Sequence, residues 1–310
     1  MADLNGDGRA DMISGSYWPG DITVFFGQGA GKFAAGEFLQ DVDGKNANAG
    51  PPWVSEKKPQ MDSLAAAPWL VDWDADGDLD LLVGNIAGHV VLLLNEGDEK
   101  APKFARKGPI EAGGQVLDVD HNDAGPTTAD WDGDGRWDLI VGGGAGTVMF
   151  FRNEGSEHAP KFAVGVELVK GKGHEPVAHG EEPKQPGSRC KPHVCDWNGD
   201  GTLDLLVGDF ASMQGPEPKL TDEQKAKKAQ LGKELDATGE TFNKLYQKCD
   251  NDPDKLTGED KKLWDATEKR SSEIWKALQP LQAESKMGGF VWVYLQKPAT
   301  KAAPNEGQRE

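Results

Sequence analysis

Four segments of the chain carry closely spaced oxygen-bearing side chains in one pattern. Counting from the first aspartate, each has aspartate at positions one, five and nine, aspartate or asparagine at position three, and glycine at position six. The segments are residues 3–11, 72–80, 130–138 and 196–204. Alternate side chains of this kind converge where the chain turns sharply, and the glycine permits such a turn.

These oxygen atoms are suited to a hard divalent cation, because calcium takes six to eight oxygen ligands at ~2.3–2.6 Å. Positions one, three, five and nine offer side-chain oxygens, and position seven offers its backbone carbonyl. We therefore predict three to four calcium sites. Their expected ligands are Asp3, Asn5, Asp7, Arg9 and Asp11; Asp72, Asp74, Asp76, Asp78 and Asp80; Asp130, Asp132, Asp134, Arg136 and Asp138; and Asp196, Asn198, Asp200, Thr202 and Asp204.

The four segments are not expected to bind equally well. The second contains five aspartates and should bind calcium most tightly. The first and fourth have Asn5 and Asn198 at position three and should bind it more weakly.

The same residue pattern also occurs in two other structures, an EF-hand and a metal-free hairpin turn. An EF-hand begins with the same pattern, but it requires glutamate at position twelve and flanking helices. Position twelve is Ser14, Val83, Val141 or Val207, so an EF-hand is excluded. The other alternative is a metal-free hairpin turn. A single copy can be such a turn, but four copies that keep their oxygen atoms favour metal binding.

The similarity between the copies extends beyond the acidic segments. Glycines lie twelve residues after the first aspartate in all four copies, at Gly15, Gly84, Gly142 and Gly208. Short apolar runs separate each segment from its glycine, and further short runs follow, bounded by glycine, asparagine or proline. Such runs are typical of strands. Four short antiparallel strands in each of several tandem copies predict the blades of a β-propeller.

The acidic segments, the apolar run and the spaced glycine together resemble the FG-GAP/VCBS repeats of integrin alpha subunits and of many bacterial exported proteins. The resemblance covers residues 1–211 and 288–298. It implies an all-β propeller, calcium in the loops, and adhesion or ligand binding more often than catalysis. The first copy lacks its first strand and the last copy lacks its fourth. The expected fold is therefore a partial or small propeller of about four blades, with a self-closed four-bladed ring as the alternative.

A helical hairpin is predicted to interrupt the last blade. The expected organisation is blades over 1–211, the helical insertion over 212–287, a returning strand over 288–298 and a disordered tail over 299–310. Thr221 and Gln224 form a capping-box pattern, and Thr257 is expected to begin a second helix. Apolar residues recur at helical spacing between residues 231 and 281, as expected for two helices that share a seam.

Composition limits the classes of partner. The chain has 310 residues, with 34 Lys and Arg against 52 Asp and Glu, a formal net charge of −18. This charge argues against binding nucleic acid or an anionic membrane. No apolar run approaches the ~18 residues needed to span a bilayer. The family resemblance and the availability of calcium place the protein outside the cytoplasm, as an extracellular, periplasmic or cell-surface protein.

Alternating strand directions put all the acidic loops on one face of a propeller and the longest connections on the other. We expect a protein or carbohydrate ligand on the face opposite the calcium loops. Self-association through unpaired blade edges is also expected. The alternative function is a lyase-like enzyme acting on polysaccharide, or the non-catalytic part of one, with Trp18, Trp53, His174 and His179 near the sugar.

Overall fold

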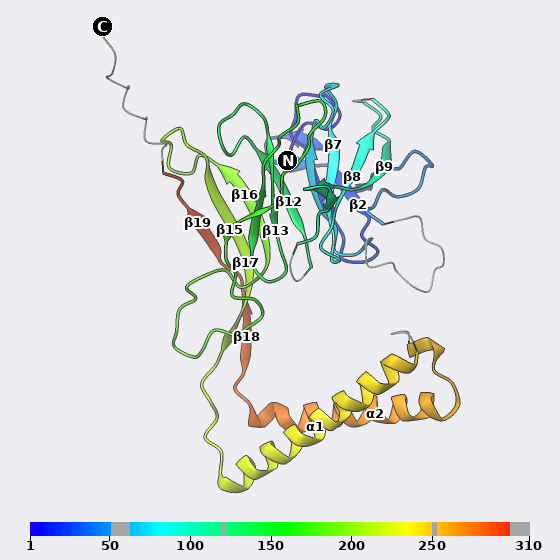
Figure 1. Cartoon of the computed structure of the whole chain (residues 1–310), viewed down its shortest axis with the longest axis vertical. Coiled ribbons are helices and arrows are strands. Elements are labelled where there is room, and N and C mark those ends of the chain that lie inside the picture. The colour runs from blue at the N-terminus through cyan, green and yellow to red at the C-terminus, as the bar shows by residue number, and fades with distance from the viewer. Residues whose placement is uncertain (51–62, 99, 120–121, 250–252, 298–310) are drawn as a thin grey trace. The chain divides into compact units, whose positions relative to one another are not determined.

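The computed structural model describes residues 1–50, 63–98, 100–119, 122–249 and 253–297 (Figure 1). Its contacts divide the chain into two compact units. The first comprises residues 1–175, 183–211 and 288–310, and the second comprises residues 176–182 and 212–287. The predicted disordered tail lies outside the described residues.

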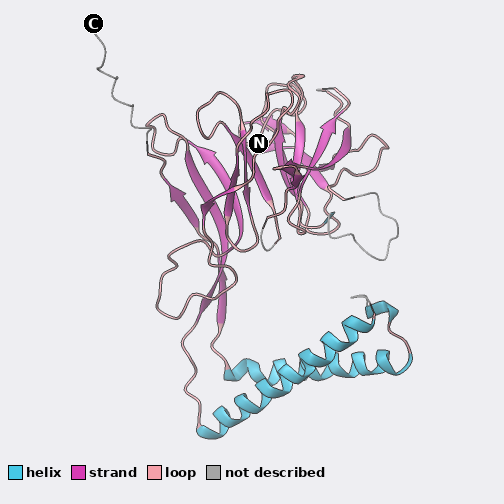
Figure 2. Cartoon of the chain, viewed as in Figure 1, coloured by secondary structure: helices cyan, strands magenta, loops and turns pink. Residues whose placement is uncertain are grey.

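The first unit is built from antiparallel sheets arranged as blades (Figure 2). The second and third blades are complete, and each has four strands paired in chain order. The second blade consists of β6 (Ala67–Val71), β7 (Asp80–Gly84), β8 (Val90–Asn95) and β9 (Phe104–Pro109). The third consists of β12 (Gly125–Ala129), β13 (Asp138–Gly142), β14 (Val148–Phe151) and β15 (Val166–Val169). Their registers correspond, since Pro68 pairs with Val83 and Pro126 with Val141.

The first and fourth blades are variants of the same sheet. The first pairs β1 (Met12–Gly15), β2 (Ile22–Phe25) and β5 (Glu37–Phe38), and a single bridge joins Ala2 to Asp11 where the first strand of the blade would lie. The fourth pairs β16 (Ser188–Cys195) with β17 (Asp204–Gln214), and β17 with both β18 (Ser285–Gly288) and β19 (Val291–Tyr294). This sheet also has four strands, but β18 and β19 both pair with β17, and among the described residues no strand pairs with the far side of β19, where the fourth strand of a repeat would lie.

Short two-stranded ribbons complete the strand inventory. They are β3 (Gly27–Gly29) with β4 (Lys32–Phe33), and β10 (Glu111–Ala112) with β11 (Gln115–Val116).

The apolar run after each acidic loop forms the central strand of a blade and is buried on both faces. In β7, Leu81 and Val83 pack in the core between the first and second blades, whereas Leu82 packs in the core between the second and third. All three are 0% exposed. Because alternate side chains of a strand point to opposite faces, a strand between two neighbouring blades must be apolar throughout. Blades stacked face to face confirm the predicted propeller-like fold.

The repeated glycine is explained by close approach of the next blade. A Cβ atom on Gly84 would lie 2.3 Å from the carbonyl oxygen of Ala124, and one on Gly142 would lie 2.2 Å from that of Cys190. No side chain fits at such distances, so these positions require glycine. Gly208 differs, because the nearest atom to its Cβ would be 3.8 Å away.

The second unit contains the predicted helical hairpin, α1 (Asp222–Lys248) and α2 (Gly258–Leu278), with short 3₁₀ turns η2 (Pro253–Lys255) and η3 (Gln279–Leu281). The predicted capping box at Thr221 and Gln224 is present, whereas Thr257 begins α2 without a side-chain cap. Leu231 packs against Ile274 and Leu278 at one end, and Leu245 clusters with Trp264 at the other, so the helices are antiparallel. Neither helix is long and apolar enough to cross a membrane.

Candidate metal sites in the acidic loops

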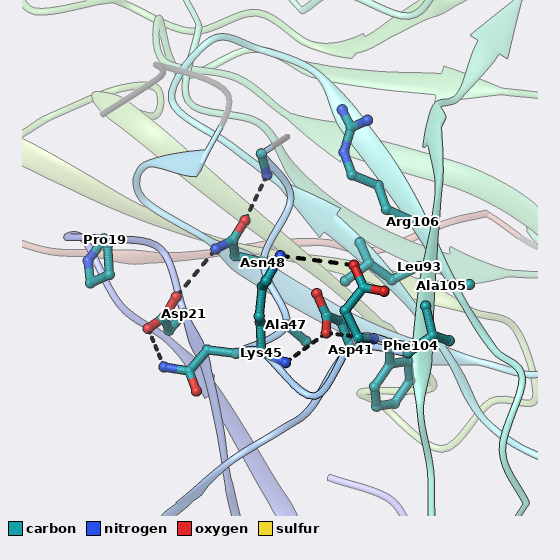
Figure 3. Close-up of a pocket in the computed structure, with 14 residues that line it drawn as sticks. Pro19, Asp21, Asp41, Lys45, Ala47, Asn48, Leu93, Phe104, Ala105 and Arg106 are labelled. Carbon is teal, nitrogen blue, oxygen red and sulfur yellow. Dashed lines mark hydrogen bonds and ion pairs between the residues drawn. The ribbon is translucent and has the colours of Figure 1, made fainter. Parts of the chain in front are cut away.

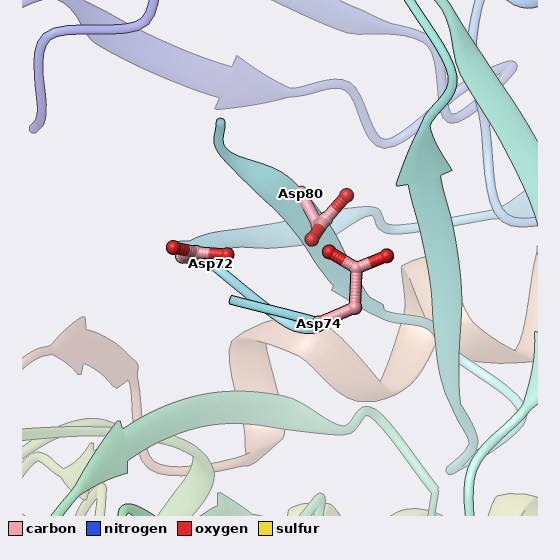
Figure 4. A group of neighbouring side chains, drawn as sticks. All are labelled: Asp72, Asp74 and Asp80. Carbon is pink, nitrogen blue, oxygen red and sulfur yellow. The ribbon is translucent and has the colours of Figure 1, made fainter. Parts of the chain in front are cut away.

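The second acidic loop connects β6 to β7 and gathers three carboxylates. One oxygen each from Asp72, Asp74 and Asp80 lies within 4.8 Å of the others (Figure 4). Asp72 and Asp74 belong to the loop itself, and Asp80 is the first residue of the buried strand β7. The loop therefore presents two carboxylates to a third that the sheet holds in place.

Several oxygens of this loop are buried without a hydrogen-bond partner. They are Asp72 Oδ1, Asp74 Oδ1 and Asp78 Oδ1. A buried carboxylate oxygen without a partner is costly, and the usual partners of buried charge are a counter-charge or a metal ion. No Lys or Arg is paired with any of these aspartates among the described residues. The oxygen atoms therefore fit a divalent cation.

Position nine has a second role that the pattern alone does not reveal. Asp80 accepts the backbone N–H of Trp73 at 2.8 Å through one oxygen and that of Asn95 at 2.7 Å through the other. These bonds connect the start of the loop to the end of β8. Burial raises the pKa of Asp80 to about 7, with Asp74 and Asp78 adding to the shift and the two N–H groups opposing it. The same pair of backbone bonds is made by Asp11, Asp138 and Asp204.

The third acidic loop, between β12 and β13, has the same geometry, but two arginines, Arg136 and Arg152, lie beside its aspartates. Asp130, Asp132 and Asp138 form the corresponding group within 4.8 Å, and Asp130 Oδ1 is buried without a partner. Arg152 Nε lies 2.6 Å from Asp132 and its Nη2 lies 3.1 Å from Asp134. A metal in this loop would therefore compete with a guanidinium group for two carboxylates.

The arginines also change the acidity of the third loop. Burial alone would raise the pKa of Asp134, but hydrogen bonds from Arg136 and Arg152 hold it below its usual value. In the second loop, burial and then repulsion from Asp76 raise the pKa of Asp78, which occupies the position of Arg136. The second loop therefore concentrates negative charge, whereas the arginines of the third loop partly neutralise the charge of its own aspartates.

The first and fourth loops turn their oxygens onto their own backbone. Asp196 accepts N–H groups of Gly199, Asp200 and Gly201 at 2.7–3.0 Å, and Asp3 accepts those of Asp7 and Gly8 at 3.1 and 2.7 Å. In the fourth loop the amide of Asn198 also donates to Asp200 at 3.0 Å. Neither loop forms a three-carboxylate group like those above among the described residues.

Among the expected ligands, positions one, three and nine thus come together in two loops. Asp76 and Asp134, at position five, lie outside these three-residue groups, and each accepts the backbone N–H two residues later. The role expected for the backbone carbonyl at position seven stays a prediction.

Sequence reasoning missed two residues near the loops. Arg152 follows β14, and the equivalent residue of the second blade is Leu94. Alignment of the repeats therefore shows a cation at this position in the third copy alone of these two. His158 lies in the connection after β14, and its Nδ1 is 3.0 Å from the carbonyl oxygen of Asp74. Of the residues expected near a sugar, Trp53 lies outside the described residues, and His174 and His179 are exposed.

Comparison with known proteins identifies a repeat family but no curated relative. No curated protein matches the chain. A family model described as the FG-GAP-like repeat matches residues 72–141 and 130–207, which include the second, third and fourth acidic loops. The predicted resemblance is therefore confirmed over residues 72–207, which carry FG-GAP-like repeats.

Proposed function

We propose that the protein is a calcium-stabilised propeller module that binds a ligand without catalysing a reaction. The observation that carries the calcium assignment is the set of buried, partnerless oxygens on Asp72, Asp74 and Asp78. The second loop is the tightest site in this proposal, the third is next, and the first and fourth are weaker. The oxygen-only donor set favours calcium over the softer transition metals.

Calcium in these loops would join neighbouring strands of a blade. Without calcium, the aspartates of the second loop repel one another, and this repulsion destabilises the turn between β6 and β7. A cation that binds only the folded chain stabilises it by mass action. Millimolar calcium is available outside the cytoplasm, so the proposal places the protein at the cell surface, in the periplasm or in the extracellular medium.

The proposed ligand-binding face is the one opposite the acidic loops. The acidic loops join the first strand of a blade to the second, while the connections from second to third strand, and from one blade to the next, emerge on the other face. Those connections include residues 16–21 and 39–50. Loops on a rigid scaffold are a common location for binding sites.

The test of the calcium assignment is a thermal melt of the full chain in calcium, in magnesium and in chelator. Each filled site should add about 2.7 kcal/mol at roughly a hundred times its Kd. Magnesium should give a smaller shift, because it demands octahedral geometry and loses its water reluctantly. Identical melting temperatures in calcium and chelator, together with no calcium heat in calorimetry, would contradict the proposal.

A second proposal, self-association through the outer face of the fourth blade, is supported by exposed apolar residues. Val291 is 69% exposed and Val293 is 39% exposed. Leu206 is half-buried, whereas its counterparts Leu82 and Ile140 are 0% exposed. Light scattering should show concentration-dependent association at micromolar protein, and Val291→Lys should reduce it. A monomer at every concentration would contradict this proposal without affecting the calcium assignment.

A further inference from the structure

A cavity of about 570 Å³ lies between the first and second blades (Figure 3). Its described lining comes from three segments. Pro19 and Asp21 belong to the connection between β1 and β2, residues 41–50 belong to the connection after β5, and Leu93 and residues 104–106 belong to the second blade. The volume falls within the ~300–1,000 Å³ range of small-molecule sites.

The floor of the cavity is apolar and rigid. Phe104 is 0% exposed, Leu93 and Ala47 are each 1% exposed, and all three belong to the core between the first and second blades. A backbone bond from Ile22 to the carbonyl of Ala47 at 3.1 Å attaches the connection to β2. The cavity is thus built on the blade interface.

One wall is organised around a buried carboxylate. Asp21 is 7% exposed, and it accepts hydrogen bonds from the side-chain amides of Asn46 at 2.7 Å and Asn48 at 3.2 Å. Asn48 also accepts the backbone N–H of Gly50 at 3.0 Å. These bonds orient both amides. Among the described residues, the carbonyl oxygen of Asn46 meets only the Gln40 amide, at 3.5 Å, so it can accept a bond from a ligand.

The opposite wall offers both hydrogen-bond acceptors and donors. Asp41 is held by the backbone N–H groups of Asp43 and Lys45, at 2.9 and 2.7 Å, through Oδ1 alone. Among the described residues nothing bonds its Oδ2. Arg106 is fixed by a 2.8 Å bond from Nε to the carbonyl of Ala49, which leaves its terminal nitrogens as donors. Lys45 Nζ lies 3.9 Å from Asp43, at the edge of ion-pair distance.

Two exposed aromatic residues lie in the chain immediately before Pro19, which lines the cavity. Tyr17 is 58% exposed and Trp18 is 54% exposed. Large exposed aromatic side chains beside a concave polar site are typical of binding surfaces, because their flat faces cover apolar ligand area at small entropic cost.

Resting on the proposed function of a ligand-binding propeller, we propose that this cavity binds a neutral sugar residue of a polysaccharide. A sugar hydroxyl both donates and accepts, which matches acceptors on Asp41 and Asn46 facing donors on Arg106 and Lys45. The C–H faces of a sugar ring match flat aromatic faces such as those of Tyr17 and Trp18, which are exposed and precede the lining residue Pro19 in the chain. Three carboxylates line the cavity against two cations, so an acidic sugar is disfavoured.

The experiment uses the full chain in saturating calcium with soluble polysaccharides as probes. Affinity electrophoresis and calorimetry compare dextran and galactomannan, which are neutral, with polygalacturonate, which is acidic. At least one neutral polymer should bind. Arg106→Ala and Asn46→Ala should each weaken that binding about tenfold. Glu37→Ala, an exposed acidic residue of the same blade that does not line the cavity, should leave it unchanged.

Asn46→Ala removes a bond to buried Asp21, so Trp18→Ala provides a second variant whose side chain is outside the core. Each variant is accepted only if its calcium-dependent melting shift matches that of the parent chain. The sugar assignment would be overturned if neither neutral polymer binds or if only polygalacturonate binds. It would also be overturned if all pocket variants bind as tightly as the parent chain. In those cases an intact calcium shift would show that the proposed calcium module survives.

Discussion

The second and third blades differ from the first and fourth in their acidic loops, because only the inner pair cluster three carboxylates among the described residues. The fourth blade differs from the other three in its repeated glycine, since Gly15, Gly84 and Gly142 each approach the backbone of the next blade. The fourth blade has the same sequence pattern, yet its loop is internally hydrogen-bonded and Gly208 has no close neighbour. A repeat can therefore keep its local pattern while the contacts that depend on neighbours are lost.

The loops show what one substitution does to such a pattern. Asn198 has an amide group that donates to Asp200, whereas Asp74 at the same position has no donor and leaves a buried oxygen without a partner. The amide satisfies the fourth loop without a cation. In the second loop Asp72 Oδ1 and Asp74 Oδ1 have no donor among the described residues, and the proposed cation would satisfy them.

The largest expected effect concerns calcium stoichiometry and directly tests the difference between the inner and outer loops. Asp74→Ala should remove the tight site of the second loop, lower the tight-binding stoichiometry by one and cost about 2.7 kcal/mol of calcium-dependent stability. Asn198→Ala, at the equivalent position, should leave the tight stoichiometry unchanged. Isothermal titration calorimetry and calcium-dependent melts measure both. Four sites of equal affinity in the parent chain would contradict the distinction between inner and outer loops.

The next largest effect concerns the glycines. Gly84→Ala should destabilise the fold by about 2 kcal/mol, because its methyl group would meet the Ala124 carbonyl at 2.3 Å. Gly208→Ala should change stability by less than about 0.5 kcal/mol, because that face is open. Urea unfolding in saturating calcium compares the two variants. Equal destabilisation would mean that another blade, from a second copy of the chain, covers Gly208 in solution.

Acidity provides a third test. The pKa of Asp80 is about 7 in the folded metal-free chain against an ordinary value of 3.8, so the folded state holds the extra proton between these values. Metal-free stability should therefore fall as the pH rises toward 7. Calcium must displace that proton, so its affinity for the second loop should fall about tenfold from about pH 8 to about pH 6.

This measurement needs the second loop isolated, which Asp132→Ala provides by disabling the third. Calcium titrations of that variant at the two pH values give the affinity change, and urea unfolding in chelator gives the metal-free trend. A calcium affinity independent of pH would show that Asp80 is ionised before the metal arrives.

The smallest expected effect sharpens the difference between the two inner loops. Arg152→Leu introduces the residue found at the equivalent position of the second blade and frees Asp132, while Asp134 keeps its ion pair with Arg136. Because Arg152 is 50% exposed, the gain in calcium affinity should be only about threefold. The reciprocal change, Leu94→Arg, should weaken the second loop by a similar factor. Calorimetry of both variants would contradict this account if neither affinity changed.

Much of the fold was predictable because it is encoded locally. Apolar runs such as residues 81–83 predict strands, and glycine at position six predicts the loop turn. Repetition made these short signals reliable. The capping residues of α1 and the helical spacing of its apolar side chains likewise predicted the hairpin, since both follow from the geometry of one helix.

The sequence by itself therefore determined the blade pattern, the position of each acidic loop and the presence of the hairpin. Tertiary structure decided which loops hold partnerless oxygens, because that depends on where each amide, guanidinium and backbone N–H lies after folding. It also brought Arg152 to the third loop and joined Asp21, Asn46 and Arg106 around one cavity. These residues are distant in the chain, and the distances between them are set by the folding of each blade and by the packing of one blade against another.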